Sequence, residues 1–246
     1  LTLHTDGSIS VEDDGRGIPF GMHAEEGVSV VEIVFTRLHA GGKFDKGAGN
    51  AYSFSGGLHG VGVSVTNALA KKLSVTVYRE GQVATITFSG GDVTERLAIR
   101  KAAAGDRKQG TTVRVWPDAK YFDSAELPRL ELTHLLRSKA VLMPGVIVTL
   151  TQEKTNETQT WQYKGGLADY LMQSIPAEPL IPLFEGEHYA EEGETENNAE
   201  GEGAAWCVAF TEDGATLRES YVNLIPTVAG GTHEAGLKDG LFTAVK

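Results

Sequence analysis

The sequence is short of cysteine, of positive charge and of long apolar runs. Cys207 is its single cysteine, so no internal disulfide can form, and we expect a reducing compartment such as the cytoplasm. No apolar stretch approaches the roughly 20 residues that cross a bilayer, and no signal-peptide pattern is present. We therefore expect no membrane partner.

Positive charge is scarce relative to negative charge. Lysine and arginine total 22 against 33 acidic residues, which gives a net charge of −11. Because nucleic-acid phosphates are held by a basic surface, this balance argues against a protein that binds nucleic acid over most of its surface. DNA contact elsewhere in a larger assembly stays open.

The composition that remains is that of a globular protein with a sizeable core, at 41% hydrophobic and 22% charged residues. A length of 246 residues suits two domains, which we place at 1–174 and 175–246. Residues 185–203 carry eight glutamates and neither lysine nor arginine. Such a tract cannot bury enough apolar area to order itself, so we expect a mobile acidic loop without chemistry. The chain opens at Leu1 in strand-like alternation, and we expect an N-terminally truncated first domain and an incomplete second one.

A glycine-rich stretch runs from Ser55 to Asn67 and reads S-G-G-L-H-G-V-G-V-S-V-T-N. Its front half holds four glycines, and its rear half becomes an apolar run. A glycine loop that leads into a helix presents free backbone N–H groups beside the positive end of the helix dipole, which suits a phosphate. The alternative is an ordinary glycine-rich turn before a buried helix.

A second candidate segment follows a predicted β-hairpin formed by 1–5 and 8–12 around Asp6-Gly7. It reads D-D-G-R-G-I-P from Asp13 to Pro19. A carboxylate at the end of a strand, followed by alternating glycines, can accept a hydrogen bond from an exocyclic amine such as that of adenine. A surface turn is the alternative. A metal site at the paired aspartates is weakly supported, because no histidine or cysteine stands at ligand spacing.

Other elements follow from periodicity and turn signals. A capping-box pattern at Ser29–Glu32 predicts a helix that continues through Leu38 and stops near Ala40. The loop 43–54 has the length of a functional lid, from which Lys43 can reach a phosphate. The remaining expected elements are strands at 73–79, 82–89, 92–100, 110–116, 145–152, 158–163, 204–210 and 217–224, and helices at 127–142, 165–174 and from 230 onward.

Three motifs and a glycine-threonine pair stand in an order that carries a family resemblance. They are D-D-G-R-G-I-P at 13–19, L-H-A-G-G-K-F at 38–44, S-G-G-L-H-G-V-G-V-S-V at 55–65 and Gly110-Thr111. Together they resemble the ATP-binding domain of the B subunits of bacterial type II topoisomerases. E-S-Y-V-N-L-I-P-T at 219–227 and G-G-T-H at 230–233 resemble the start of the transducer domain. The first of these and the F-S-G-G form of the loop are closer to the topoisomerase IV branch than to gyrase.

The resemblance implies an α+β fold. Its first part is a two-layer α/β sandwich of the gyrase/Hsp90/histidine-kinase/MutL ATPase type, and a ribosomal-S5-like transducer domain begins after it. The implied function is an ATPase that couples ATP binding and hydrolysis to DNA strand passage, decatenation and relaxation, and so to chromosome segregation. Implied cofactors are ATP and Mg²⁺. Implied partners are DNA, the topoisomerase IV A subunit in an A2B2 heterotetramer, and aminocoumarin-type inhibitors, at a cytoplasmic, nucleoid-associated location.

The resemblance also implies roles for individual residues. Asp13 accepts the adenine amino hydrogen bond with help from Thr111, residues 15–19 form the pocket floor with Arg16 at its rim, and Lys43 touches phosphate or ribose. The implied nucleotide-binding residues are Asp13, Gly15, Arg16, Gly17, Ile18, Pro19, Lys43, Leu58, His59, Gly60, Val61, Gly62, Val63 and Thr111. The implied inhibitor contacts are Asp13, Arg16, Pro19, Arg79 and Thr111, with Arg79 at the mouth of the pocket.

The family's catalytic Glu and Mg²⁺-binding Asn are expected upstream of Leu1, and its γ-phosphate lysine beyond Lys246. The chain itself is thus expected to bind nucleotide as a monomer without hydrolysing it, with no catalytic or metal residue of its own. Alternatives are the B subunit of gyrase, a chaperone-type or mismatch-repair ATPase on the same fold, and a regulatory nucleotide-binding module.

Overall fold

The structure is a computed structural model that describes residues 1–40, 60–124, 127–191, 201–212 and 217–246. The chain forms two compact units, one made of 1–129 with 149–159 and the other of 130–148 with 160–246. The predicted domain boundary after Ser174 stays a prediction. Among the described residues, no helix combines the length and the apolar character needed to cross a membrane.

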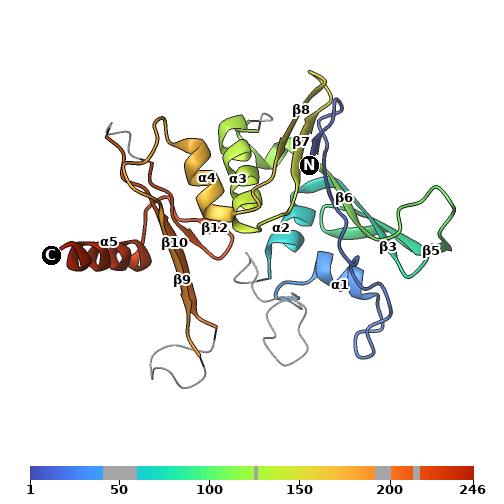
Figure 1. The fold of residues 1–246 in the computed structure, drawn as a ribbon. Coiled ribbons are helices and arrows are strands. Elements are labelled where there is room, and N and C mark those ends of the chain that lie inside the picture. Colours follow the sequence, from blue (N-terminus) through green and yellow to red (C-terminus); the bar gives the residue numbers. More distant parts are fainter. Residues whose placement is uncertain (41–59, 125–126, 192–200, 213–216) are drawn as a thin grey trace. The chain divides into compact units, whose positions relative to one another are not determined.

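An eight-stranded sheet dominates the first unit (Figure 1), in the order β5-β4-β3-β6-β2-β1-β7-β8. Its strands are antiparallel neighbours wherever β1 to β6 pair, whereas β1 and β7 run parallel. The strands are β1 (Thr2–Leu3), β2 (Ile9–Asp13), β3 (Ala70–Arg79), β4 (Gln82–Ser89), β5 (Asp92–Lys101), β6 (Gly110–Pro117), β7 (Val148–Gln152) and β8 (Glu157–Trp161).

The predicted hairpin of β3 and β4 is confirmed, with Arg79 opposite Gln82. Its two turn residues, Glu80 and Gly81, have φ values of 53° and 71°, as the commonest two-residue hairpin turn requires. Every second residue from Leu73 to Val77 is buried, because successive side chains of a strand point to opposite faces of the sheet.

The helices of this unit are α1 (Val30–Thr36), α2 (Gly62–Ala68) and a short 3-10 helix at Ala119–Tyr121. The hydroxyl of Ser29 accepts a hydrogen bond from the N–H of Glu32 at 3.2 Å, which confirms the predicted cap of α1. Buried Phe35 stacks on Phe88 of β4 with ring centroids 5.7 Å apart. The core of the unit therefore lies between α1 and one face of the sheet. It consists of Val31, Phe35, Ala70, Leu73, Val75, Val77, Ala84, Ile86 and Phe88.

The predicted end of α1 near Ala40 was wrong. The helix stops at Thr36, because Arg37 adopts an extended conformation while its N–H still bonds to Ile33. Leu38, predicted to continue the apolar face, is 62% exposed.

The second unit contains α3 (Arg129–Leu142, apart from its first residue), α4 (Gly166–Ser174), β9 (Phe184–Tyr189), β10 (Gly203–Val208), β11 (Tyr221–Val222), β12 (Ile225–Pro226) and α5 (Thr232–Val245). Tyr163 and Tyr170 meet edge to face at 5.6 Å in a small core with Ala140 and Val141. The predicted helices at 127–142, at 165–174 and from 230 onward are confirmed within a few residues.

Two expectations for this unit need correction. Residues 185–189 were expected within the acidic loop, but they belong to β9, whose backbone pairs with β10 from Phe184↔Val208 to Tyr189↔Gly203. An edge strand tolerates Glu185 and Glu187 because both side chains stay exposed. The rest of the acidic tract includes 192–200, which lie outside the described residues.

The strand predicted at 217–224 was too long. It is limited to Tyr221–Val222, since Asn223 has a φ of 53° and turns the chain into β12.

Candidate functional site

The site is built where β2 ends beside β6. Asp13, the last residue of β2, stands opposite Thr111 at the start of β6. Thr111 is 5% exposed, and its hydroxyl accepts a hydrogen bond from the N–H of Ile18 at 3.3 Å. The structure thus brings together three residues that the sequence assigned to one pocket.

The carboxyl group of Asp13 lies exposed just past this pairing. Its Oδ1 accepts a hydrogen bond from the N–H of Gly15 at 2.9 Å, an aspartate turn that fixes the orientation of the carboxyl group. A carboxylate has lone pairs for about four hydrogen bonds, so this one leaves acceptor capacity for a ligand.

Gly17 allows the 15–19 segment to lie against the end of β3. Its φ is +75°, and a Cβ added there would come within 2.8 Å of the backbone oxygen of Tyr78 and 3.0 Å of a methyl of Val77. The carbonyl of Gly17 accepts a hydrogen bond from Nη1 of Arg79 at 3.0 Å, and Nε of Arg79 pairs with Glu80 at 2.8 Å. Arg79 therefore holds the segment predicted to form the pocket floor.

The other two residues of this segment that were assigned to the pocket, Arg16 and Pro19, are exposed. Ile18 is half-buried and packs against the core of the unit. Ile18 thus attaches the segment to the core, while Arg16 and Pro19 are exposed to solvent.

The predicted phosphate loop is described only in its rear half. Lys43, Leu58 and His59 lie outside the described residues. Gly60 has a φ of 64°, and α2 begins at Gly62 with Val61 as its N-cap and no side chain capping it. No hydrogen bond between described residues joins 60–63 to the group around Asp13.

The buried face of α2 is polar rather than apolar. Asn67 is fully buried and donates from Nδ2 to the carbonyls of Phe35, at 3.0 Å, and Gly91, at 3.2 Å. Val63 and Val65 are each 43% exposed. Only Ser64 and Asn67 of α2 are buried, and the alternative of an ordinary glycine-rich turn before a buried helix stays open.

Two polar residues outside the predicted motifs reach the same site. Arg107 donates from Nη2 to the carbonyl of Asp13 at 2.8 Å, and Gln109 donates from Nε2 to the carbonyl of Asp14 at 2.9 Å. The signal available in the sequence was their position just before Gly110-Thr111.

The described residues hold no cluster of three or more His, Cys, Asp or Glu that could bind a metal ion.

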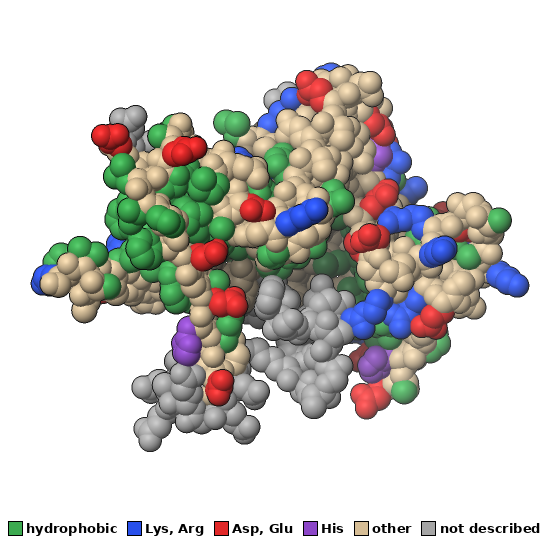
Figure 2. Space-filling model, in the orientation of Figure 1, with side chains coloured by type: hydrophobic (Ala, Val, Ile, Leu, Met, Phe, Trp, Pro, Cys, Tyr) green, Lys and Arg blue, Asp and Glu red, His purple; other side chains and the backbone are tan. Residues whose placement is uncertain are grey.

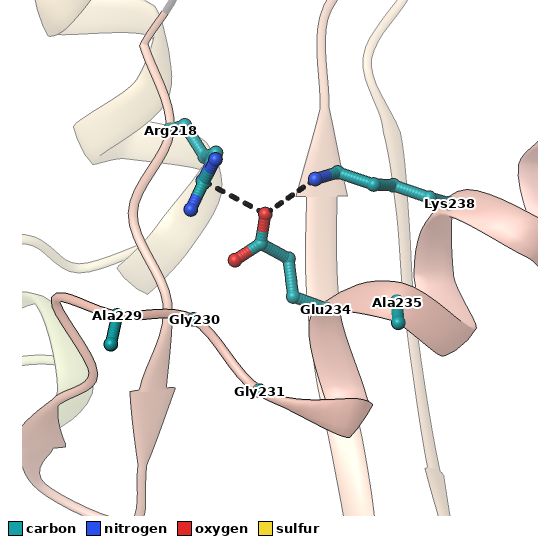
Figure 3. Close-up of a pocket in the computed structure, with 7 residues that line it drawn as sticks. All are labelled: Arg218, Ala229, Gly230, Gly231, Glu234, Ala235 and Lys238. Atoms are coloured by element: carbon teal, nitrogen blue, oxygen red, sulfur yellow. Dashed lines mark ion pairs between the residues drawn. The ribbon is translucent and has the colours of Figure 1, made fainter.

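A separate pocket of about 240 Å³ lies in the second unit, at the start of α5 (Figure 3). Glu234 points into it between two cations, with Oε1 at 2.8 Å from Nε of Arg218 and 2.7 Å from Nζ of Lys238. The ammonium group of Lys238 lowers the pKa of the Glu234 carboxyl. This carboxylate offsets one of the two positive charges, and the pocket contains none of the predicted nucleotide-binding residues.

Comparison with known proteins agrees with the geometry of both units. Residues 1–121 match the family described as histidine kinase-, DNA gyrase B-, and HSP90-like ATPase, and residues 166–246 match the family described as DNA gyrase B. The B subunit of DNA topoisomerase 4 from Salmonella typhimurium is 46% identical over 249 residues, which cover 100% of this chain and 38% of the relative. The chain therefore spans well under half the length of the curated relatives it matches.

Two solved structures are similar in fold. The topoisomerase IV ATP-binding domain of Francisella tularensis, in complex with a small-molecule inhibitor, aligns with a TM-score of 0.69 at 35% identity, covering 99% of this chain and 61% of that one. The 43K ATPase domain of Thermus thermophilus gyrase B, in complex with an aminocoumarin, aligns with a TM-score of 0.75 at 30% identity, covering 97% and 58%. These matches confirm the predicted ATPase fold class, and the chain belongs to the family of DNA topoisomerase IV and DNA gyrase B subunits, within their ATPase region.

Proposed function

We propose that the site around Asp13 binds the adenine of ATP. The observation that carries this proposal is the pairing of Asp13 with Thr111 at the ends of β2 and β6. An ionised carboxylate accepts a hydrogen bond from the exocyclic amine of adenine, and the hydroxyl of Thr111 assists through a water molecule.

The neighbouring backbone supports a flat ligand. In this proposal Gly15, Gly17, Ile18 and Pro19 form the floor of the pocket, where Gly15 carries no side chain and Ile18 and Pro19 add apolar surface, and Arg16 stands at the rim. Removing the Cβ atoms lets a ring approach the backbone closely.

In this proposal the triphosphate extends toward the glycine loop. Gly60, Val61, Gly62 and Val63 surround the β- and γ-phosphates, together with Leu58 and His59, and Lys43 reaches phosphate or ribose. The positive φ of Gly60 and the start of α2 at Gly62 support this arrangement, because backbone N–H groups at a helix start attract anions. Mg²⁺ accompanies the phosphates and neutralises their charge.

We further propose that the whole protein is a topoisomerase IV-type B subunit. It would couple ATP binding and hydrolysis to DNA strand passage, together with the A subunit in an A2B2 heterotetramer in the bacterial cytoplasm. The 46% identity to a protein of that name supports this branch. Hydrolysis needs a general base beside the attacking water, and residues 175–246 would begin the transducer domain.

The same pocket is proposed to accept aminocoumarin-type inhibitors through Asp13, Arg16, Pro19, Arg79 and Thr111. The similar gyrase B structure was solved with an aminocoumarin. Support within this chain comes from Arg79, whose side chain bonds directly to the pocket floor at Gly17.

The adenine assignment is tested by replacing the charge of one carboxylate. Asp13→Asn should weaken binding of a non-hydrolysable ATP analogue by about 1.5–3 kcal/mol, the worth of a hydrogen bond to a charged group. It should also improve binding of the matching inosine nucleotide relative to ATP, because an amide can donate to the 6-oxo group whereas a carboxylate cannot. Titration calorimetry measures both.

The matched control is Asp14→Asn, which removes the same charge from the next residue and should change neither affinity nor base preference. Unchanged affinity in Asp13→Asn, or an equal loss in both variants, would overturn the adenine assignment.

A further inference from the structure

We propose that Arg107, supported by Gln109, is a positioning residue that aims the Asp13 carboxylate and thereby contributes to the choice of adenine over other bases. The inference rests on the proposed binding of ATP at Asp13. It concerns a different element, the loop 102–109 between β5 and β6, which neither the motifs nor the family resemblance assigned to the site.

Arg107 and Gln109 grip the backbone where strand pairing ends. Asp13 is the last residue of β2, so the ladder to β6 stops there. The carbonyls of Asp13 and Asp14 then accept hydrogen bonds from Arg107 at 2.8 Å and from Gln109 at 2.9 Å. Two side-chain donors thus bond to backbone carbonyls at the point where strand pairing ends.

Gly110 also packs closely against the peptide that follows Asp13. Its φ is +123°, and a Cβ added there would come within 2.1 Å of the carbonyl oxygen of Asp13. The peptide that follows Asp13 is therefore packed against Gly110 and bonded to Arg107. Oδ1 of Asp13 bonds to the N–H of Gly15, the residue after Asp14. A shift of the Asp13–Asp14 peptide therefore also turns the carboxyl group of Asp13.

The loop that carries Arg107 is itself anchored. Asp106 accepts from both terminal nitrogens of Arg100, at 2.6 and 3.0 Å, and from the N–H of Ala103 at 2.7 Å. The hydrogen bond from Arg100 lowers the pKa of Asp106 to about 2, so this anchor stays ionised near neutral pH. Such a bidentate pair fixes geometry as well as charge.

The guanidinium of Arg107 is held by two further contacts. It lies 5.9 Å from the ring centroid of Tyr78, and its Nη1 lies 3.4 Å from Oε2 of Glu12. Glu12 offsets its positive charge, so Arg107 acts on the site through geometry more than through attraction of phosphates. The backbone oxygen of the same Tyr78 lies against Gly17 in the segment predicted to form the pocket floor.

The test measures base preference as well as affinity. Titration calorimetry compares non-hydrolysable analogues of ATP and of ITP in the wild-type chain and in Arg107→Ala. Arg107→Ala should weaken the ATP analogue about tenfold, the upper end of what one hydrogen bond contributes, and weaken the ITP analogue much less. The preference for ATP should therefore fall.

Control variants separate positioning from charge and from stability. Lys108→Ala removes one positive charge from the neighbouring, exposed residue of the same loop and should leave the preference unchanged. Arg107→Lys keeps a hydrogen-bond donor and should therefore retain part of the preference for the ATP analogue. Gln109→Ala should lower it less than Arg107→Ala does. In an Asp13→Asn background, Arg107→Ala should have little further effect on the preference, because there is no longer a carboxylate to aim.

The outcomes distinguish the two proposals. If Arg107→Ala weakens both nucleotides equally, or if Lys108→Ala matches it, then Arg107 does not position Asp13. If Arg107→Ala does not fold, Gln109→Ala and Arg107→Lys decide the question by the ratio of their affinities for the ATP and ITP analogues. If the wild-type chain shows no preference for ATP over ITP, the adenine assignment of Asp13 fails first.

Discussion

At the residue scale, the site depends on places where a Cβ atom has no room. Gly17 and Gly110 both have positive φ, and an added Cβ on either would strike a backbone oxygen of a neighbouring segment. Gly81 also has positive φ, at 71°, but an added Cβ there would meet nothing within 4 Å. Comparing Gly17 with Gly81 therefore separates the cost of a left-handed backbone conformation from the cost of a steric collision.

Gly17→Ala should therefore cost more stability than Gly81→Ala. The left-handed conformation alone costs an L-residue about 1–2 kcal/mol, and the collision with Tyr78 should add about 1–3 kcal/mol of overpacking. Urea denaturation of the two variants measures the difference. Equal losses would show that the 15–19 segment can move away from β3 without penalty.

At the element scale, a partly buried polar network connects the helices of the second unit to the chain around β11. Tyr170 of α4 donates its hydroxyl to Oε1 of Glu219 at 2.6 Å, and Tyr221 donates to Oε2. Arg137 of α3 donates to the hydroxyl of Tyr163 at 2.7 Å and lies 4.7 Å from the ring centroid of Tyr170. The carboxylate of Glu219 thus joins α4 to β11, and neither element carries a catalytic motif.

Burial and the neighbouring Glu219 raise the pKa of Tyr170 to about 12. Its folded pKa lies above the value of about 10 for a free tyrosine, so the stability it contributes is present below pH 10. It is lost as the pH rises from 10 through 12. Wild-type protein should exceed Tyr170→Phe by about 1–3 kcal/mol at pH 8, and the difference should shrink over that window.

Denaturant unfolding at several pH values gives this difference, and tyrosinate absorbance follows the titration. Tyr189→Phe, at an exposed tyrosine of β9, serves as control. A stability difference that does not change up to pH 12 would contradict the assigned hydrogen bond.

At the scale of the whole molecule, the net charge is negative, and the acidic tract 185–203 carries eight of the glutamates. Figure 2 shows acidic and basic side chains interspersed over the right-hand part of the visible face, where β3 to β6 lie, with no continuous basic stripe. Hydrophobic side chains gather on the same view near α4 and β10. With a net charge of −11, the chain has little to offer to a phosphate backbone.

The chain by itself should accordingly bind duplex DNA weakly. We expect no mobility shift at micromolar protein in about 0.15 M salt, since non-specific binding depends on releasing counterions from neutralised phosphates. A repeat at low salt tests whether any residual binding is electrostatic. Tight, salt-resistant binding would contradict this and would place a DNA contact within the chain.

Much of the local structure could be predicted because its causes are local. The Glu80-Gly81 turn, the Ser29 cap of α1 and the helix after Gly230-Gly231 each depend on a few adjacent residues. One prediction failed because a partner distant in sequence decided the outcome, whereas the ends of α1 and β11 were missed through the local conformations of Arg37 and Asn223. The backbone of 185–189 is a strand because β10 pairs with it, despite its charge.

The candidate site divides in the same way. Its motifs identified Asp13, Gly15, Gly17, Ile18, Arg79 and Thr111, and the structure brings these residues together. Arg107 and Gln109 were not identified, because their position before Gly110-Thr111 does not show that their side chains donate to the carbonyls of Asp13 and Asp14. The assigned roles of all these residues stay predictions until binding is measured.

The sequence by itself determined the turn chemistry, the alternation of the strands and the order of the motifs, since each depends on residues near one another in the chain. Only the tertiary structure decided that Ile18 bonds to Thr111, 93 residues away, and that α2 buries Ser64 and Asn67 instead of Val63 and Val65. Strand register and helix orientation follow from which distant surfaces pack together. The physical reason is that a long-range contact needs two partners, and the sequence around either one does not specify the other.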